Sequence, residues 1–388
     1  MTPTLIPQDI VNEIVEKIKS DKKALKKVSL ISRSFCDPCR KHLFARLELD
    51  CRRVKRIKAF HRILTLNPDL AHNPRYLNLI IYEGSNDKVL PLILRALNNL
   101  RSISWQVPQA EPLSWTAFQP SLKTALIERL QAPGLSNIDI SHVTGFPLSL
   151  FSVCTDLKKL TLTDIFSPTC IYHEVSLEEN VRPKAWLQSL SISSTFNADH
   201  SFARVFTHLL TSVEISQLRQ LHVGSVRRDD EILECQKVIE ASAYSLKELT
   251  LIVKFTFMTP QRAFDLNSVT SLRRLTIKMA QNPRMLEWLQ SILLSANNSL
   301  EHVKLSLFDQ LVAEENQSVL TKLTDIDDTL ADPRFENLRS VSLAFDSWMS
   351  RPILGSSFTE QCMPKLASKE ILCVYWNNKP LFFVKTTS

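Results

Sequence analysis

The chain has 388 residues, 44% hydrophobic and 22% charged, a composition typical of globular proteins that permits one large domain or two to three modest ones. No apolar run approaches the ~18 residues of a membrane span, and we find neither a secretory signal nor a disulfide framework. We therefore expect a soluble protein of the cytoplasm, the nucleus or both. Residues 1–75 hold 17 basic and 8 acidic side chains, against 30 and 32 in the rest, which excludes a protein that coats nucleic acid along its whole length.

The first 47 residues are expected to form short helices. Pro7 suits the first turn of a helix over residues 7–19. Ser20-Asp21 interrupts this helix and can cap a second one over residues 22–29. A further helical stretch is predicted over residues 31–44.

Apolar residues fall on two sides of these helices. The first helix has one stripe of Ile6, Ile10 and Ile14 and another of Val11, Val15 and Ile18; beyond it, Leu25, Val28, Ser32 and Phe35 share one side, with Leu30 and Ile31 on another. A helix carries one apolar stripe when it packs against one surface, and so small a segment cannot bury two sides by itself. One side is expected to close a small core. The other is covered either by the body of this chain or by a separate protein.

A basic amphipathic helix is predicted over residues 52–66, RRVKRIKAFHRILTL, before Asn67-Pro68 ends it. Its apolar side is formed by Val54, Ile57, Phe60 and Leu64. We expect this side to pack on the first repeat of the body and the basic side to face water. The alternatives for the basic side are a membrane surface, RNA or an acidic partner.

A short pattern, Leu-x-x-apolar-x-apolar, repeats from about residue 73 onward. It occurs as LRSISW (100–105), LSNIDI (135–140), LKKLTL (157–162), LQSLSI (187–192), LRQLHV (218–223), LKELTL (246–251), LRRLTI (272–277), LEHVKL (300–305) and LRSVSL (338–343). PRYLNLIIY (74–82) is a candidate opening strand and KEILCVYW (369–376) a candidate closing one. Each pattern ends in an apolar-polar-apolar alternation, which predicts a strand with one buried face.

Helical patterns lie between these strands, most clearly at residues 199–212, 229–242 and 283–296. A strand and a helix at intervals of 22–38 residues are the signature of a leucine-rich-repeat solenoid. We therefore predict an α/β solenoid, with parallel strands on a concave side and helices on a convex side. The variable intervals favour an irregular horseshoe.

No residue pattern supports catalysis or a bound cofactor. The five glycines are isolated, which excludes the usual phosphate-binding loops. Cys36, Cys39 and His42 form C-x-x-C-x-x-H, but zinc needs about four ligands and no second pair lies nearby, so we expect structural cysteines. The acidic run TDIDDTL (324–330) lacks the glycine and spacing of a calcium loop and predicts a solvated helix start. We expect no enzyme, no cofactor and no metal.

The N-terminal segment resembles an F-box. The resemblance rests on Ile6-Pro7, Asp9-Ile10, Ile14, Leu25, Val28-Ser29-Leu30, Ile31-Ser32-Arg33 and Phe35, with isoleucine for the usual first leucine and phenylalanine for the usual tryptophan. Residues 53–83 and 141–164 resemble the linker and repeats of fungal F-box/leucine-rich-repeat proteins. The resemblance implies an F-box over residues 1–50, a basic linker helix over 51–72 and leucine-rich repeats over 73–388.

The resemblance also implies a function without bond chemistry. The F-box would bind a Skp-type adaptor and through it a cullin, and the repeats would hold a protein substrate for ubiquitination. Carried over by position, the adaptor contacts would be Ile6, Pro7, Ile10, Ile14, Leu25, Val28 and Ser32. Substrate contacts are expected at the polar strand positions Ser104, Asp139, Thr161, Ser191, His222, Thr250, Thr276, Lys304 and Ser342. Two alternatives stay open: a repeat scaffold outside a ligase, and a membrane- or RNA-associated protein that uses the basic helix, although we expect no nucleic acid or membrane partner.

Overall fold

The computed structural model describes residues 6–84, 88–108, 112–165, 184–194, 203–255, 260–280, 283–308, 316–346, 362–376 and 379–383. The chain divides into two compact units, residues 1–185 and 186–388, which are described separately below. Within the described residues, every helix is too short or too polar to cross a membrane.

The first unit begins with three short helices, α1 (Gln8–Ile18), α2 (Lys22–Val28) and α3 (Arg33–Leu43). The boundary between α1 and α2 follows the prediction from the sequence. The carboxylate of Asp21 accepts the backbone N–H groups of Lys23 and Ala24 at 2.8 and 3.0 Å, which caps the start of α2.

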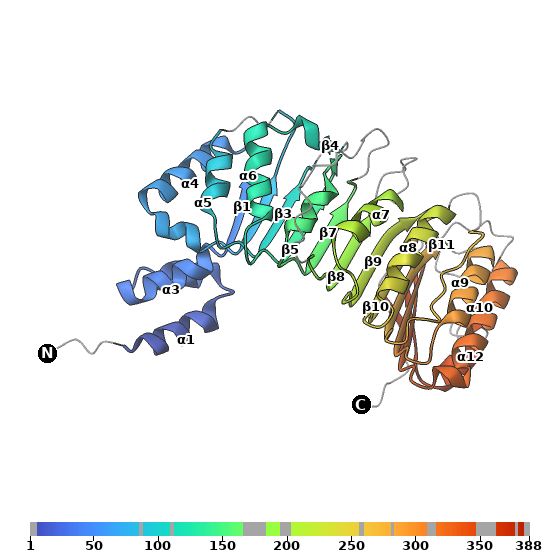
Figure 1. Ribbon diagram of the computed structural model, residues 1–388. Helices are drawn as coiled ribbons and strands as arrows, with labels where there is room; N and C mark the ends of the chain where they lie inside the picture. Colours follow the sequence, from blue (N-terminus) through green and yellow to red (C-terminus); the bar gives the residue numbers. More distant parts are fainter. Residues whose placement is uncertain are drawn as a thin grey trace. The chain divides into compact units, whose positions relative to one another are not determined.

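Strands and helices alternate through the rest of this unit (Figure 1). Five parallel strands pair in chain order: β1 (Arg46–Asp50), β2 (Tyr76–Ile80), β3 (Ser102–Gln106), β5 (Asn137–Ser141) and β7 (Lys159–Thr163). The helices between them are α4 (Val54–Leu66), α5 (Leu90–Ala96) and α6 (Pro120–Leu130), with short 3₁₀ turns at Pro68–His72, Trp115–Ala117 and Leu148–Val153. A small separate sheet joins β4 (Leu113–Ser114) to β6 (Val143–Thr144).

The second unit repeats the same construction. Seven parallel strands pair in chain order: β8 (Ser189–Ser193), β9 (Gln220–Val226), β10 (Glu248–Val253), β11 (Arg274–Ala280), β12 (His302–Phe308), β13 (Ser340–Asp346) and β14 (Leu372–Trp376). The helices are α7 (Ala203–Ser212), α8 (Asp229–Ala241), α9 (Pro283–Ser295), α10 (Asn316–Ala331) and α12 (Pro364–Ser368), with a 3₁₀ turn at Pro333–Phe335. Strand β15 (Lys379–Phe383) pairs with β14 in the antiparallel direction.

The repeated sequence pattern explains this construction. The structure confirms all eleven strands that the pattern predicted. In each pattern the first leucine and the two later apolar residues are buried, as Leu218, Leu221 and Val223 are in β9. The residue between the last two apolar positions points to the other face and stays partly or fully exposed. A single strand and helix cannot bury their own apolar side, so neighbouring strand–helix repeats must stack to form the core.

Several features differ from the sequence-based expectation, among them the antiparallel strand β15. The sheet begins one strand earlier than predicted, at β1. The repeat pattern did not predict this strand because Phe44 stands at the position of the first leucine, in FARLEL (44–49). The run 324–330 lies in the interior of α10 instead of at a helix start. Val54 at the beginning of α4 is exposed, whereas Ile57 and Leu64 are buried as expected.

Candidate functional site

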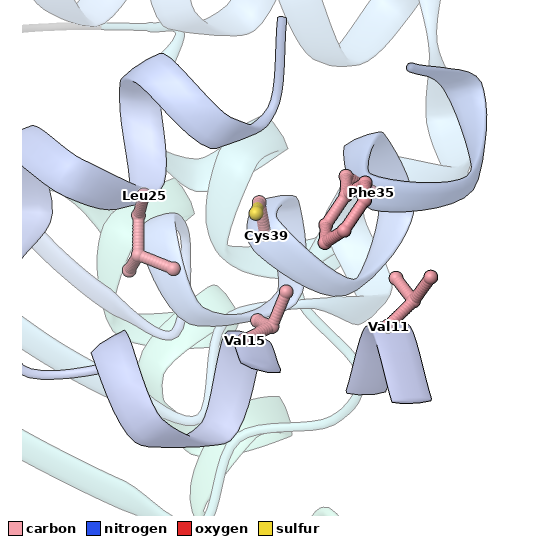
Figure 2. Close-up of a cluster of buried hydrophobic side chains, with 5 residues drawn as sticks. All are labelled: Val11, Val15, Leu25, Phe35 and Cys39. Carbon is pink, nitrogen blue, oxygen red and sulfur yellow. The ribbon is translucent and has the colours of Figure 1, made fainter. Parts of the chain in front are cut away.

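The three N-terminal helices share a small hydrophobic core of their own. Val11 and Val15 of α1 face Phe35 and Cys39 of α3, and Leu25 of α2 closes the cluster (Figure 2). Ile18, Val28 and Leu43 pack against it and are partly buried. The second apolar stripe of α1 therefore has an internal partner within the same helices.

The first apolar stripe of α1 faces water. Ile10 and Ile14 are 47% and 39% exposed, and Ile6 is exposed as well. The turn between α2 and α3 adds Leu30, which is 85% exposed, and Ile31. We call these five residues the N-terminal apolar patch. Residues 6–31 thus hold five of the fourteen exposed large hydrophobic residues in the described chain, a concentration that marks interaction surfaces.

One hydrogen bond holds the beginning of α1 near the beginning of α3. Gln8 Nε2 donates to the backbone oxygen of Ser34 at 3.4 Å. Ser34 follows Ile31 by three residues, so this bond places the exposed turn near the N-terminal end of α1. The two parts of the patch are therefore held by one small, internally packed unit.

The structure separates the predicted adaptor contacts into two groups. Ile6, Pro7, Ile10, Ile14 and Ser32 are exposed. Leu25 is only 1% exposed and belongs to the internal core, and the partly buried Val28 packs against that core. The reason is that both side chains of α2 point toward α1 and α3, so their role here is structural. Leu30 and Ile31 are the exposed residues that the residue-by-residue comparison left out, although their position off the main stripe was visible in the sequence.

The predicted substrate contacts are aligned by strand register. Ser104, Asp139 and Thr161 are direct neighbours across β3, β5 and β7 in the first unit. In the second unit, one row across β8 to β13 contains Ser191, His222, Thr250, Thr276, Lys304 and Ser342. We call each alignment a polar row. Because adjacent strands lie about 4.8 Å apart, each row presents closely spaced polar groups that a protein segment can contact.

The row in the first unit is rich in hydrogen-bonding groups. Ser104 Oγ donates to Asp139 Oδ2 at 3.2 Å. Asn78, the neighbour of Ser104 on β2, extends the row, and its Oδ1 is buried without a hydrogen-bond partner in the described chain. Burial raises the pKa of Asp139, while the bond from Ser104 and the positive charge of Lys159 oppose the change. An unpaired buried acceptor is costly, so Asn78 favours a ligand that brings an N–H group.

In the second unit, burial lowers the pKa of His222, and the positive charge of Lys278 lowers it further. Lys278 lies on β11, two strands away from His222 on β9, and faces the same side of the sheet. The sequence analysis predicted one polar contact residue per strand and so did not include Lys278. This residue follows Thr276 by two positions on β11 and faces the same side of the sheet. Lys278 and Lys304 thus bring two positive charges to this part of the sheet face.

The structure also places the cysteine motif and the basic helix. Cys39 is buried in the N-terminal core, where burial raises the pKa of its thiol. In the described part of the chain, no group of three or more His, Cys, Asp or Glu side chains is arranged to hold a metal ion. The basic side chains of α4 are exposed, and Arg52 and Arg53 just before it contact the buried carboxylate of Asp50 at 3.3 and 3.4 Å.

Comparison with known protein families and with curated proteins returns no match for this chain.

Proposed function

We propose that this chain is a non-catalytic substrate receptor of a cullin-based ubiquitin ligase. The N-terminal helices act as an F-box that binds a Skp-type adaptor, and the stacked strand–helix units act as leucine-rich repeats that hold a protein substrate. In the ligase, this chain would bring a substrate lysine close to the conjugating enzyme that carries ubiquitin as a thioester. This proximity raises the effective concentration of the lysine near the thioester.

One observation carries the proposal. The N-terminal helices bury Val11 and Val15 in a core of their own but leave Ile10 and Ile14 in water, one residue before each buried valine. Sealing a half-exposed isoleucine in an interface contributes about 1 kcal/mol, since full burial contributes roughly 1.5–3 kcal/mol. A partner that covers the five patch residues therefore gains several kcal/mol from this surface alone.

The test is capture of a purified Skp-type adaptor by the full-length chain. We expect Ile10→Asp combined with Ile14→Asp to weaken capture at least a hundredfold. The interface would lose about 2 kcal/mol of apolar burial and would have to desolvate two carboxylates, and each 1.4 kcal/mol is tenfold in affinity. Because both positions are exposed in the free chain, the melting temperature should stay nearly unchanged.

The matched control replaces two leucines of similar exposure outside the patch. Leu92 on α5 and Leu294 on α9 are 48% and 52% exposed, so Leu92→Asp combined with Leu294→Asp introduces the same chemistry elsewhere. This control should retain the adaptor. Equal capture by both double variants would refute the assignment of the interface.

Co-purification of a cullin separates the ligase from the alternative of a repeat scaffold that uses the adaptor outside a ligase. If the wild-type chain brings down the adaptor together with a cullin, and the patch variant brings down neither, the ligase assignment stands. Adaptor without cullin would favour the scaffold.

A further inference from the structure

Positive charge is concentrated on one region of the second unit, where β9 to β12 lie side by side. Lys304 on β12 is the direct neighbour of Thr276 on β11, and Lys278 follows Thr276 by two residues. Standard strand spacings place the two lysine Cα atoms about 8 Å apart on the same face. In the described part of the chain, neither lysine has a carboxylate within ion-pair distance, and Lys304 is exposed.

A second set of cations borders the same strands. Arg219, Lys247 and Arg273 immediately precede β9, β10 and β11, and their backbones form a ladder with N–H to O distances of 2.9 Å. All three side chains are exposed. They are therefore spaced about 4.8 Å apart along the edge where the strands begin.

This concentration is not a consequence of overall basicity. Residues 186–388 contain 21 basic and 22 acidic side chains. Eight acidic residues lie on two helices: α8 carries five carboxylates against one lysine, and α10 carries three aspartates against one lysine. Glu248 on β10 and Glu301 just before β12 are each paired with an arginine, Arg274 and Arg273. These helices cover one face of the strands (Figure 1). The alternating burial along β10 and β11 assigns the buried apolar side chains to that covered face and the polar row to the other. The unit is thus close to neutral but has one basic strand face.

We propose that the strand face of β9 to β12 binds an extended protein segment rich in aspartate and glutamate, which runs across the strands. Side chains two residues apart in such a segment point the same way at intervals of about 6.7 Å, a spacing compatible with that of Lys278 and Lys304. The threonine hydroxyls of the polar row on this face, those of Thr250 and Thr276, can bond to its backbone. Complementary charge of this kind speeds association and selects the partner.

The chemistry of the cations favours carboxylates over phosphates. Phosphate recognition uses arginine in bidentate geometry, but Arg274 already pairs with Glu248 at 2.8 Å and Arg273 with Glu301 at 3.1 Å. Apart from Arg219 at the border of the strand face, the cations of this face without an ion pair in the described chain are lysines, which act as point charges. Nucleic acid fits less well because β9 to β12 present no Phe, Tyr or Trp in the polar row for base stacking.

The inference rests on the proposed function only in naming the segment a substrate; binding itself is tested independently. The probe is a fluorescein-labelled peptide of six Glu-Ser repeats, added to the full-length chain. The comparison peptides are six Gln-Ser repeats, a phosphoserine peptide of the same length without Asp or Glu, and a single-stranded RNA oligonucleotide. We expect the Glu-Ser peptide to bind with the highest affinity of the four probes. Its affinity should fall as the salt concentration increases.

Lys278→Glu combined with Lys304→Glu should weaken Glu-Ser binding about tenfold or more. The matched control, Lys237→Glu combined with Arg284→Glu, makes the same charge change on α8 and α9, where both side chains are exposed, and should bind within twofold of wild type. Lys278→Gln combined with Lys304→Gln is a milder variant, and it should also weaken binding if the reversed pair proves unstable.

The outcomes distinguish this inference from the ligase proposal. Ile10→Asp combined with Ile14→Asp should lose the adaptor but bind the Glu-Ser peptide normally. Unchanged peptide binding by both lysine variants, equal binding of the Gln-Ser peptide, or preferential binding of the phosphopeptide or RNA would overturn the inference and leave the adaptor result untouched.

Discussion

Two leucines five residues apart separate the internal core of the N-terminal helices from their outer surface. Leu25 is 1% exposed and Leu30 is 85% exposed, so Leu25→Ala and Leu30→Ala remove the same atoms from opposite environments. Truncating a buried leucine to alanine costs about 2–5 kcal/mol, whereas a surface substitution costs within about 0.5 kcal/mol. The consequence should be local, because the cluster around Leu25 consists of N-terminal helix residues.

Native-state hydrogen exchange is the appropriate assay. Helices of this length, 11, 7 and 11 residues, are marginal alone and depend on their shared core. We therefore expect Leu25→Ala to accelerate amide exchange throughout α1 to α3 by about thirtyfold or more, which corresponds to the lower limit of 2 kcal/mol. Amides of β9 to β12 should be unaffected, and Leu30→Ala should exchange like wild type.

Two results would refute this reasoning. Exchange in α1 that is unchanged by Leu25→Ala would show that the small core does not hold the helices together. Equal acceleration by Leu30→Ala would show that Leu30 is buried in solution, which would remove it from the proposed adaptor surface.

Three further predictions concern the second unit. Asp327 accepts two backbone N–H groups at the start of α12, at 2.8 and 2.9 Å, so Asp327→Ala should cost about 2 kcal/mol or more in denaturant unfolding, whereas Asp328→Ala, which breaks only a surface ion pair, should cost less than about 1 kcal/mol. A Cβ on Gly224 would lie 2.7 Å from Ser193 Cβ, so Gly224→Ala should lower the unfolding midpoint by an amount equivalent to about 1–3 kcal/mol; an unchanged midpoint would contradict the close approach of β8 and β9. Because the pKa of His222 is lower in the folded than in the unfolded chain, the unfolded chain binds the extra proton first, and stability should fall as the pH drops below about 6.5; His222→Gln should reduce this dependence in melting curves recorded from pH 7.5 to 5.5.

The strands and their register were predictable because one local pattern sets both. A leucine before each strand and two alternating apolar residues within it determine which side chains enter the core. The same spacing in every strand–helix repeat aligns Thr250, Thr276 and Lys304 in one row. β1 was missed because Phe44 replaces the first leucine. The antiparallel strand β15 was missed because its sequence, KPLFF, lacks the pattern.

The candidate sites were less accessible from the sequence. Helical periodicity showed that the N-terminal helices have two apolar sides, but which side is internal depends on how three short helices pack. Sequence spacing places Leu25 and Leu30 on different sides, but only the packing determines that Leu25 is buried and Leu30 exposed. Likewise, the basic strand face depends on the pairing of β11 with β12, which brings Lys278 close to Lys304 from residues far apart in the chain.

The most direct test of the account measures hydrogen exchange of the full-length chain with and without a saturating Skp-type adaptor. We predict slower exchange in α1 and around Leu30 and Ile31 when the adaptor is present, and no change in β9 to β12. An adaptor that leaves residues 6–31 as accessible as in the free chain would contradict the claim that this surface is completed by a partner protein.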